Sequence, residues 1–180
     1  MNYAQSARRF RVPVGFVAAA LYVLFARPTW SSMLFGTAII LPALVLRTAA
    51  SGHVKKNQEV TTSGPYAYTR NPLYLGSIIL VIGFGVASRN VWLASALVIT
   101  FLALYLPVVR EEEDHLRAQF PEYGDYAQRV PRIIPRISAG VSSAAGFSSD
   151  LYRKHREYNA ALGSIGMMIL LILKLQFFSR

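Results

Sequence analysis

Residues 71–109 read NPLYLGSIILVIGFGVASRNVWLASALVITFLALYLPVV, and this stretch decides the fold. Its one charged side chain, Arg89, divides it into apolar runs of 18 and 20 residues. A helix needs about 20 mainly apolar residues to cross the hydrocarbon layer of a bilayer. Because almost nothing is left over for a connection, the stretch predicts two membrane-spanning helices joined by a tight turn.

Three more apolar runs lie outside this hairpin, two before it and one near the end of the chain. We predict membrane spans at residues 12–27, 28–46, 71–88, 90–109 and 158–178. The first and last runs are short, and a buried core helix is the alternative interpretation of each. The predicted fold is an all-α integral membrane protein with five transmembrane helices, in a single domain over residues 1–180.

The composition agrees with a membrane protein. The chain has 180 residues, of which 53% are hydrophobic and 16% charged, and its mean hydropathy is +0.34. Charged residues make up about a quarter of ordinary soluble domains, and a chain this apolar does not remain disordered. It has no cysteine, which excludes disulfides, thiolate zinc sites and a cysteine nucleophile. His53 and His115 lack the spacing of metal ligands, so no metal site is predicted.

Charged residues gather on one side of the predicted membrane. With five spans, residues 1–11, 47–70 and 110–157 share a face, which carries 15 of the 19 Lys and Arg residues and all nine acidic residues. The positive-inside rule makes this face cytoplasmic, with the N-terminus on it and the C-terminus opposite. Trp30 and Trp92 fall at the other ends of their spans, where an interfacial aromatic belt is expected. Since the basic residues flank spans, the formal charge of +10 does not indicate a nucleic-acid partner.

The first connection on the charged face ends in a pattern that suits an anionic group. Gly64-Pro65 is a turn signal, and Pro72 is suited to the first turn of the third span. Arg70 and Asn71 therefore lie at the membrane surface beside a helix N-terminus, whose free N–H groups and partial positive charge attract anions. The alternative is that the Tyr and Arg residues here are ordinary interfacial anchors.

The second connection begins with four consecutive acids, residues 111–114, directly after the fourth span. Acids at a helix C-terminus oppose the macrodipole, and a broken rule of this kind often marks function. The alternative is a solvated face. Leu116, Phe120 and Tyr123 follow at i, i+4 and i+7, which predicts an amphipathic helix on the membrane or folding back to it, with Pro121 as a point of interruption.

The two connections together form a distinctive set of motifs. They resemble those of the integral-membrane isoprenylcysteine carboxyl methyltransferase and phospholipid methyltransferase family, over residues 45–135. The residues that carry the resemblance are Gly64, Pro65, Tyr66, Arg70, Asn71, Pro72, Leu73, Tyr74, Glu112, Glu113, Leu116, Phe120, Tyr123, Tyr126, Arg129, Val130, Pro131 and Pro135.

The resemblance implies methyl transfer from S-adenosylmethionine to a lipidic substrate at the cytoplasmic face. The acceptor would be a prenyl-cysteine-like carboxylate or a phospholipid amine headgroup, and membrane lipid is the expected surrounding, with no obligate protein partner. The implied catalytic residues are Glu112, Glu113 and Arg70. The implied cofactor-binding residues are Gly64, Pro65, Tyr66, Arg70, Asn71, Pro72, Tyr74, Glu112 and Glu113, together with His53 of the same connection.

The chemistry of the cofactor agrees with these residue types. Carboxylates such as Glu112 and Glu113 suit its sulfonium and ammonium cations, and Arg70 suits its carboxylate. Tyrosine faces suit adenine and, by cation–π attraction worth about 0.5–2 kcal/mol, the sulfonium.

Two positions depart from the family pattern. Asn71 stands where a His is usual, and because Asn cannot titrate, a general base at that position is excluded. Val108 stands where the carboxyl-methylating branch has an Arg, one helical turn before Glu112, so carboxylate and amine acceptors both remain open. The alternative from another class is a non-catalytic membrane scaffold or lipid-binding protein that retains the motifs. A membrane reductase using a nicotinamide cofactor is a weaker alternative, because the chain has too few spans for that group.

Overall fold

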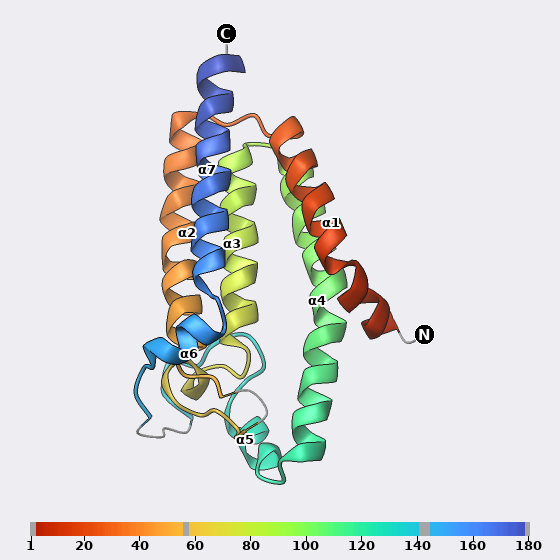
Figure 1. Cartoon of the computed structure of the whole chain (residues 1–180), viewed down its shortest axis with the longest axis vertical. Helices are drawn as coiled ribbons and strands as arrows, with labels where there is room; N and C mark the ends of the chain where they lie inside the picture. The colour runs from red at the N-terminus through yellow and green to blue at the C-terminus, as the bar shows by residue number, and fades with distance from the viewer. Residues whose placement is uncertain (1–2, 56–57, 141–144, 179–180) are drawn as a thin grey trace.

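We describe a computed structural model of the chain, which covers residues 3–55, 58–140 and 145–178, with side chains from residue 13 to 177 within these ranges. All secondary structure in this part of the chain is helical, which confirms the all-α prediction (Figure 1). The elements are α1 (Tyr3–Phe25), α2 (Trp30–Ser51), the 3-10 turn η1 (Gly64–Ala67), α3 (Pro72–Ser88), α4 (Val91–Gln119), α5 (Tyr123–Arg129), α6 (Ser149–Lys154) and α7 (Tyr158–Phe178).

Five of these helices stand at the five predicted spans. Three apolar segments are long enough to cross a bilayer, namely Trp30–Ser51, Val91–Gln119 and Tyr158–Phe177, and two are shorter, Pro13–Phe25 and Pro72–Ser88. Large apolar side chains are exposed along their outer faces. Soluble monomers rarely expose such extended apolar surface, whereas lipid covers it in a membrane.

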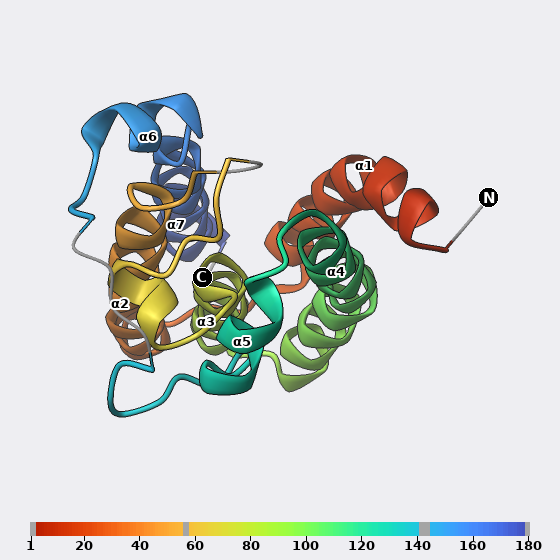
Figure 2. The same cartoon turned by 90° about the horizontal axis from the view of Figure 1, so that it is seen from below.

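The helices form an elongated bundle with two different ends (Figure 1). We call the end that carries the connections 52–71 and 120–157 the cap end, and the end with the short turns at Arg27 and Arg89 the hairpin end. Seen from the cap end, α2, α3 and α7 form one group while α1 leans on α4 (Figure 2). Helix α3 contacts both α2 and α4, and so joins the two groups.

Close contact between α2 and α3 depends on glycine. A Cβ atom added at Gly36 would lie 2.6 Å from Cβ of Ala87, and one added at Gly83 would lie 2.7 Å from Cγ1 of Ile40. Small residues allow helix backbones to approach in this way, and membrane helices use them because burial from water does not drive their association. Helices α2 and α3 are therefore the most closely packed pair in the bundle, and we call this pair the spine.

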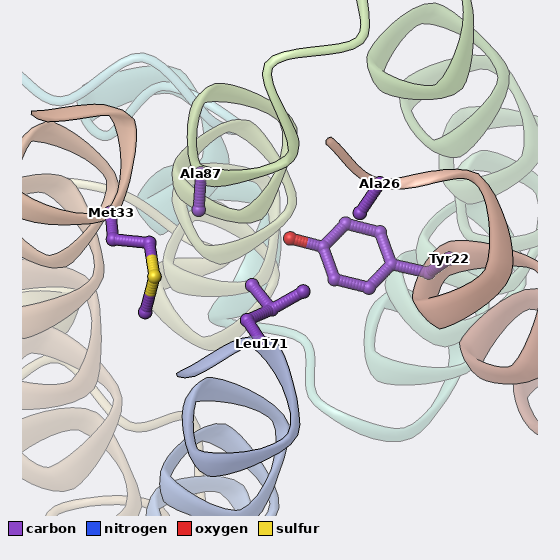
Figure 3. Close-up of a cluster of buried hydrophobic side chains, with 5 residues drawn as sticks. All are labelled: Tyr22, Ala26, Met33, Ala87 and Leu171. Atoms are coloured by element: carbon purple, nitrogen blue, oxygen red, sulfur yellow. The ribbon is translucent and has the colours of Figure 1, made fainter. Parts of the chain in front are cut away.

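A small apolar core lies near the hairpin end (Figure 3). It consists of Tyr22, Ala26, Met33, Ala87 and Leu171, all at most 5% exposed. The hydroxyl of Tyr22 donates a hydrogen bond to the carbonyl of Phe84 at 2.8 Å. The core thus ties α1, α2, α3 and α7 together at the end of the molecule that lacks acidic residues.

Helix α4 is longer than predicted, and this corrects one interpretation. At 1.5 Å per residue its 29 residues extend about 43 Å, more than the roughly 30 Å of a bilayer core. The acidic residues 111–114 lie inside the helix, which ends at Gln119. The idea that they oppose the dipole at a helix C-terminus is therefore wrong, because the helix continues past the apolar run.

The residues after α4 form a small core in the cap. Pro121 separates α4 from α5, so Leu116 and Tyr123 do not share one helix as their spacing predicted. Instead Leu116 and Phe120 pack against a buried cluster of Tyr123, Tyr126 and Val130. The apolar residues whose spacing suggested a membrane-surface helix thus pack against one another within the cap.

Candidate functional site

A cavity of about 330 Å³ opens under the cap, within the size range of small-molecule sites. Its walls come from the end of α2, the connection 54–61, η1, the start of α3, the middle of α4, α5 and the residue before α7. Five of the implied site residues line it: Tyr66, Arg70, Asn71, Tyr74 and Glu112. The other five, His53, Gly64, Pro65, Pro72 and Glu113, lie outside the lining.

Glu112 presents its carboxylate to the cavity. One of its oxygens, Oε2, accepts a hydrogen bond from the hydroxyl of Tyr74 at 2.9 Å. Within the described residues Glu112 has no ion-pair partner. A carboxylate held in place but not neutralised by a protein cation is suited to bind a cationic group of a ligand.

Glu113, its neighbour, is used differently. It is 3% exposed and is surrounded by donors from the protein itself. Its Oε1 accepts from Nδ2 of Asn71 at 2.9 Å and lies 3.4 Å from Nε of Arg70, as an ion pair rather than an aligned hydrogen bond. Its Oε2 accepts a hydrogen bond from Nε of Arg132 at 2.9 Å and lies 2.8 Å from Nη2 of the same guanidinium, as an ion pair. A buried carboxylate with this many partners holds the cap together.

The two connections are joined by backbone hydrogen bonds around this network. The N–H of Arg70 donates to the carbonyl of Pro131 at 2.9 Å, and the N–H of Arg136 donates to the carbonyl of Tyr68 at 3.0 Å. The hydroxyl of Thr69 donates to the carbonyls of Arg132 and Ile133, at 3.2 and 3.0 Å. The segment 129–136 therefore serves as the strap that fixes residues 66–71 against the cavity. Sequence reasoning did not single out Arg132, although it follows Pro131 directly.

Buried tyrosines form the floor of the cavity. Tyr126 donates from its hydroxyl to the carbonyl of Tyr66 at 2.8 Å. Burial, with the carboxylates of Glu112 and Glu157 nearby, raises the pKa of Tyr66 above its ordinary range. Burial likewise raises the pKa of Tyr123 to about 12. These hydroxyls therefore stay protonated at neutral pH and act as neutral donors.

An aromatic wall on α4 was missed by the sequence reasoning. Tyr105 lines the cavity, makes an edge contact with Tyr74 at 5.9 Å between ring centroids, and stacks on Phe101 at 4.3 Å. Its position was readable in principle, since Tyr105 precedes Glu112 by seven residues, which is two helical turns on the same face. Its place inside an apolar run made it look like an ordinary lipid-facing residue.

An ion pair between Arg47 and Glu157 was also missed. Both side chains line the cavity, and they join the end of α2 to the residue before α7. Arg47 also donates to the carbonyl of Leu73 at 3.1 Å and to the hydroxyl of Ser77. The two residues are far apart in sequence and belong to no motif, so only a folded structure brings them together.

The remaining implied residues shape the cap. Gly64 has a φ of +54°, and a Cβ there would lie 2.7 Å from the ring of His53. His53 packs on Phe147 and places Nδ1 2.7 Å from the carbonyl of Ala49. Pro65 stands in η1, and Pro72 is the buried first residue of α3. These positions support the turn that presents Tyr66 and Arg70 rather than contacting the cavity.

Comparisons with known proteins bear on the family to which these motifs belong. The family model described as "Phospholipid methyltransferase" matches residues 47–123. The family resemblance is confirmed over this segment. It runs from Arg47 to Tyr123, and so contains most of the cavity wall.

Two curated relatives are named for metal resistance. The chain is 34% identical over 139 residues to the cobalt-zinc-cadmium resistance protein CzcN of Cupriavidus metallidurans, covering 72% of this chain and 63% of the relative. It is 38% identical over 84 residues to the nickel-cobalt-cadmium resistance protein NccN of Alcaligenes xylosoxydans xylosoxydans, covering 47% of this chain and 39% of the relative. The chain thus matches less than two thirds of the length of either relative. No solved structure matches it significantly.

Proposed function

We propose that this protein is a membrane methyltransferase that uses S-adenosylmethionine and methylates a lipidic acceptor in the cavity under the cap. The observation that carries the proposal is Glu112, whose carboxylate faces the cavity with Tyr74 as its hydrogen-bond donor and no ion-pair partner among the described residues. It lies within the segment that matches the phospholipid methyltransferase family.

The cavity wall fits the charges of this cofactor. Three cationic side chains (Arg47, Lys55, Arg70) and three acidic side chains (Glu59, Glu112, Glu157) line it, and of the six only Glu112 has no ion pair within the described residues. S-adenosylmethionine supplies a methyl group activated by a sulfonium cation. Glu112 would hold the cationic part, Arg70 the carboxylate, and the rings of Tyr66, Tyr74 and Tyr105 the adenine.

The protein residues contribute orientation and exclusion of water. Tyr66 is 8% exposed, and the strap 129–136 holds it and Arg70 in place through Tyr126 and Pro131. Fixing two reactants in the correct geometry can lower a barrier by about 7–11 kcal/mol. A neutral tyrosine floor also keeps competing charges away from the cofactor.

The lining favours an amine as the acceptor. Arg47 is a cation at the cavity wall, but Glu157 already binds it. An acceptor carboxylate would have to displace Glu157. Glu112, in contrast, is a carboxylate at the wall with no ion-pair partner among the described residues, and it can take a proton from an attacking amine. We therefore propose an amine-bearing lipid headgroup as the acceptor.

We further propose that all five long helices cross the membrane, with the cap end in the cytoplasm. The cap end carries all nine acidic residues and most of the basic ones, as the positive-inside rule requires of a cytoplasmic face. A water-soluble cofactor would then enter from the cytoplasm, while Tyr105 and Ser77 extend the cavity wall along α3 and α4 toward the lipid.

Calorimetric titration of the detergent-purified protein with S-adenosylhomocysteine tests the cofactor assignment. We expect saturable binding, reduced about 10- to 100-fold in Glu112→Gln through loss of a charge-assisted interaction. Asp114→Asn is the matched control, because Asp114 belongs to the same acidic run but is exposed and outside the cavity. Equal affinity in Glu112→Gln and the wild-type protein would remove Glu112 from the site.

The acceptor is tested with methyl-labelled cofactor and vesicles of phosphatidylethanolamine. Label that enters the lipid fraction and survives alkali indicates an N-methyl product, whereas a methyl ester releases its label on alkaline hydrolysis. Binding of S-adenosylhomocysteine without any transfer to lipid would instead favour the non-catalytic, lipid-binding alternative.

A further inference from the structure

A second cavity, of about 400 Å³, lies at the hairpin end of the bundle. It is bounded by the α1–α2 turn, the α3–α4 turn and the last part of α7. Three cationic side chains line it, Arg27, Arg89 and Lys174, and no acidic one does. All nine acidic residues of the chain lie between positions 59 and 157, at or near the cap. The positive charge at the hairpin end is thus not balanced by any acidic side chain.

Lys174 has a structural role in this cavity. Its ammonium donates to the carbonyls of Val23 and Leu24 at 2.6 and 2.7 Å. Nδ2 of Asn90 similarly donates to the carbonyl of Phe25 at 3.1 Å. These donors satisfy the carbonyls at the C-terminal end of α1, where a positive charge is also favoured by the helix dipole.

The two arginine side chains have no comparable role. Their backbone N–H groups are used, since Arg27 donates to the carbonyl of Ser88 at 2.8 Å and Arg89 to that of Val86 at 3.1 Å. Within the described residues, however, neither guanidinium has a hydrogen bond or an ion pair, and both side chains are exposed. Two forked donors at the edge of one cavity are thus available to a ligand.

The backbone conformation of Arg89 is a second observation that points to a role for its side chain. Its φ of 49° and ψ of 30° put it in the left-handed region, at the C-cap of α3. Gly or Asn is the usual residue there, and an ordinary L-residue pays about 1–2 kcal/mol for the conformation. An arginine at a position that favours Gly or Asn indicates that its side chain contributes something that the local structure does not require.

With the five helices placed across the membrane as proposed above, the cavity lies at the level of lipid headgroups. Trp30 and Trp92, at the first turns of α2 and α4 beside it, are 61% and 83% exposed. Tryptophans of this kind sit at the membrane–water interface. The anionic group that a membrane offers at this depth is the phosphate of a lipid.

We propose that the hairpin-end cavity binds the phosphate of an anionic phospholipid headgroup, with Arg27 and Arg89 as its donors and Lys174 adding positive charge. This lipid is distinct from the acceptor proposed for the cap, because the two cavities lie at opposite ends of the bundle. Lipid bound here would hold the α1–α2 and α3–α4 turns together, and so stabilise the arrangement of the helices.

The test is thermal unfolding of the full chain in neutral detergent, titrated with phosphatidylglycerol, phosphatidylcholine or inorganic phosphate. We expect a saturable rise in Tm with phosphatidylglycerol and little change with phosphatidylcholine. Each of Arg27→Gln and Arg89→Asn should weaken the apparent affinity for phosphatidylglycerol about fivefold, from about 1 kcal/mol per cation near a lipid surface. A full response to inorganic phosphate alone would overturn the assignment to a lipid.

Two features of the variants separate binding from folding. Because Asn tolerates the left-handed backbone, Arg89→Asn should leave the lipid-free Tm unchanged or raised while its response to phosphatidylglycerol shifts to higher lipid concentration. Arg156→Asn is the matched control, since Arg156 also has a positive φ, of 52°, but lies near the cap. An equal loss of response in Arg156→Asn would show nonspecific attraction to charge and overturn the proposed site.

Discussion

The two ends of this bundle are held together by different kinds of interaction. The cap end brings together acids, bases and tyrosines that largely satisfy one another, with Glu113 at the centre of donors from Asn71, Arg70 and Arg132. The hairpin end is held by an apolar core, by glycine packing and by donors that cap α1. At each end a charged group beside a cavity has no ion-pair partner among the described residues: the carboxylate of Glu112 under the cap, and the guanidiniums of Arg27 and Arg89 at the hairpin end.

A charged side chain that no protein group neutralises is a candidate for binding a ligand, whereas one that is bonded to protein groups has a structural role. Glu113 and Lys174 are both engaged by protein groups, and their removal should damage structure. Glu112 and Arg27 lie beside cavities, and their removal should damage binding. The predictions below separate these two consequences.

The largest effect is expected from Glu113→Ala, which leaves Arg70 and Arg132 without their shared carboxylate. Breaking a buried pair costs about 3–5 kcal/mol. The loss should be confined to the cap: hydrogen exchange should accelerate in peptides from 120–136 but not in those from 22–36. Asp114→Ala, at the exposed neighbouring position, is the control. Faster exchange at both ends in Glu113→Ala would mean that the cap is not an independent unit.

The next effect concerns the spine of the bundle. Gly36→Ala places a methyl group 2.6 Å from Cβ of Ala87 and should destabilise the protein by about 1–3 kcal/mol through overpacking. Gly163→Ala on α7 meets nothing within 4 Å, and should be neutral or stabilising because Ala favours a helix. Unfolding in detergent measures both. Equal stability of the two variants would refute a close α2–α3 contact.

Much of the fold could be predicted, because the length of an apolar run can be counted directly along the sequence. The apolar runs 71–88 and 90–109 correspond to α3 and α4, which begin at Pro72 and Val91 and are joined at Arg89. The C-terminal end of α4 could not be predicted in this way. An apolar run shows which residues lie inside the membrane, whereas the helix itself continues through the charged residues 111–114.

Less of the site could be predicted, because its partners are distant in sequence. Glu112 and Glu113 look alike as neighbours, yet successive residues on a helix point about 100° apart, and only one of the two lines the cavity. Arg47 meets Glu157, and Glu113 meets Arg132, through folding of the cap rather than through any periodic pattern. The motifs located the site, but they could not divide its residues between binding and support.

A smaller effect is expected from Tyr74→Phe, which removes the hydroxyl that donates to Glu112. The ring remains to contact Tyr105, so the change tests the hydroxyl separately from the ring. We expect the affinity for S-adenosylhomocysteine to fall about 2- to 10-fold, as loss of one hydrogen bond of about 0.5–1.5 kcal/mol implies. Tyr68→Phe, at an exposed position outside the cavity, should have no effect. Calorimetry would contradict the assigned role of Tyr74 if both variants bound like the wild-type protein.

The smallest effect is a loss of cap stability at alkaline pH. Tyr123 ionises near pH 10 when unfolded, but burial raises the pKa of its folded form to about 12. Between these values the unfolded state has released its proton and the folded state has not, so stability that is fully present below pH 10 falls as the pH rises. The loss should stay below about 1 kcal/mol at pH 11, because Tyr123 borders the cavity, where water reduces the effect.

Two optical signals can locate this loss. The difference in tyrosinate absorbance between the wild-type protein and Tyr123→Phe separates Tyr123 from the other nine tyrosines and so reports the cap, whereas fluorescence of Trp30 and Trp92 reports the hairpin end, where both tryptophans lie. With rising pH this difference in absorbance should develop before the fluorescence changes. Simultaneous change of both signals would mean that the two ends unfold as one unit.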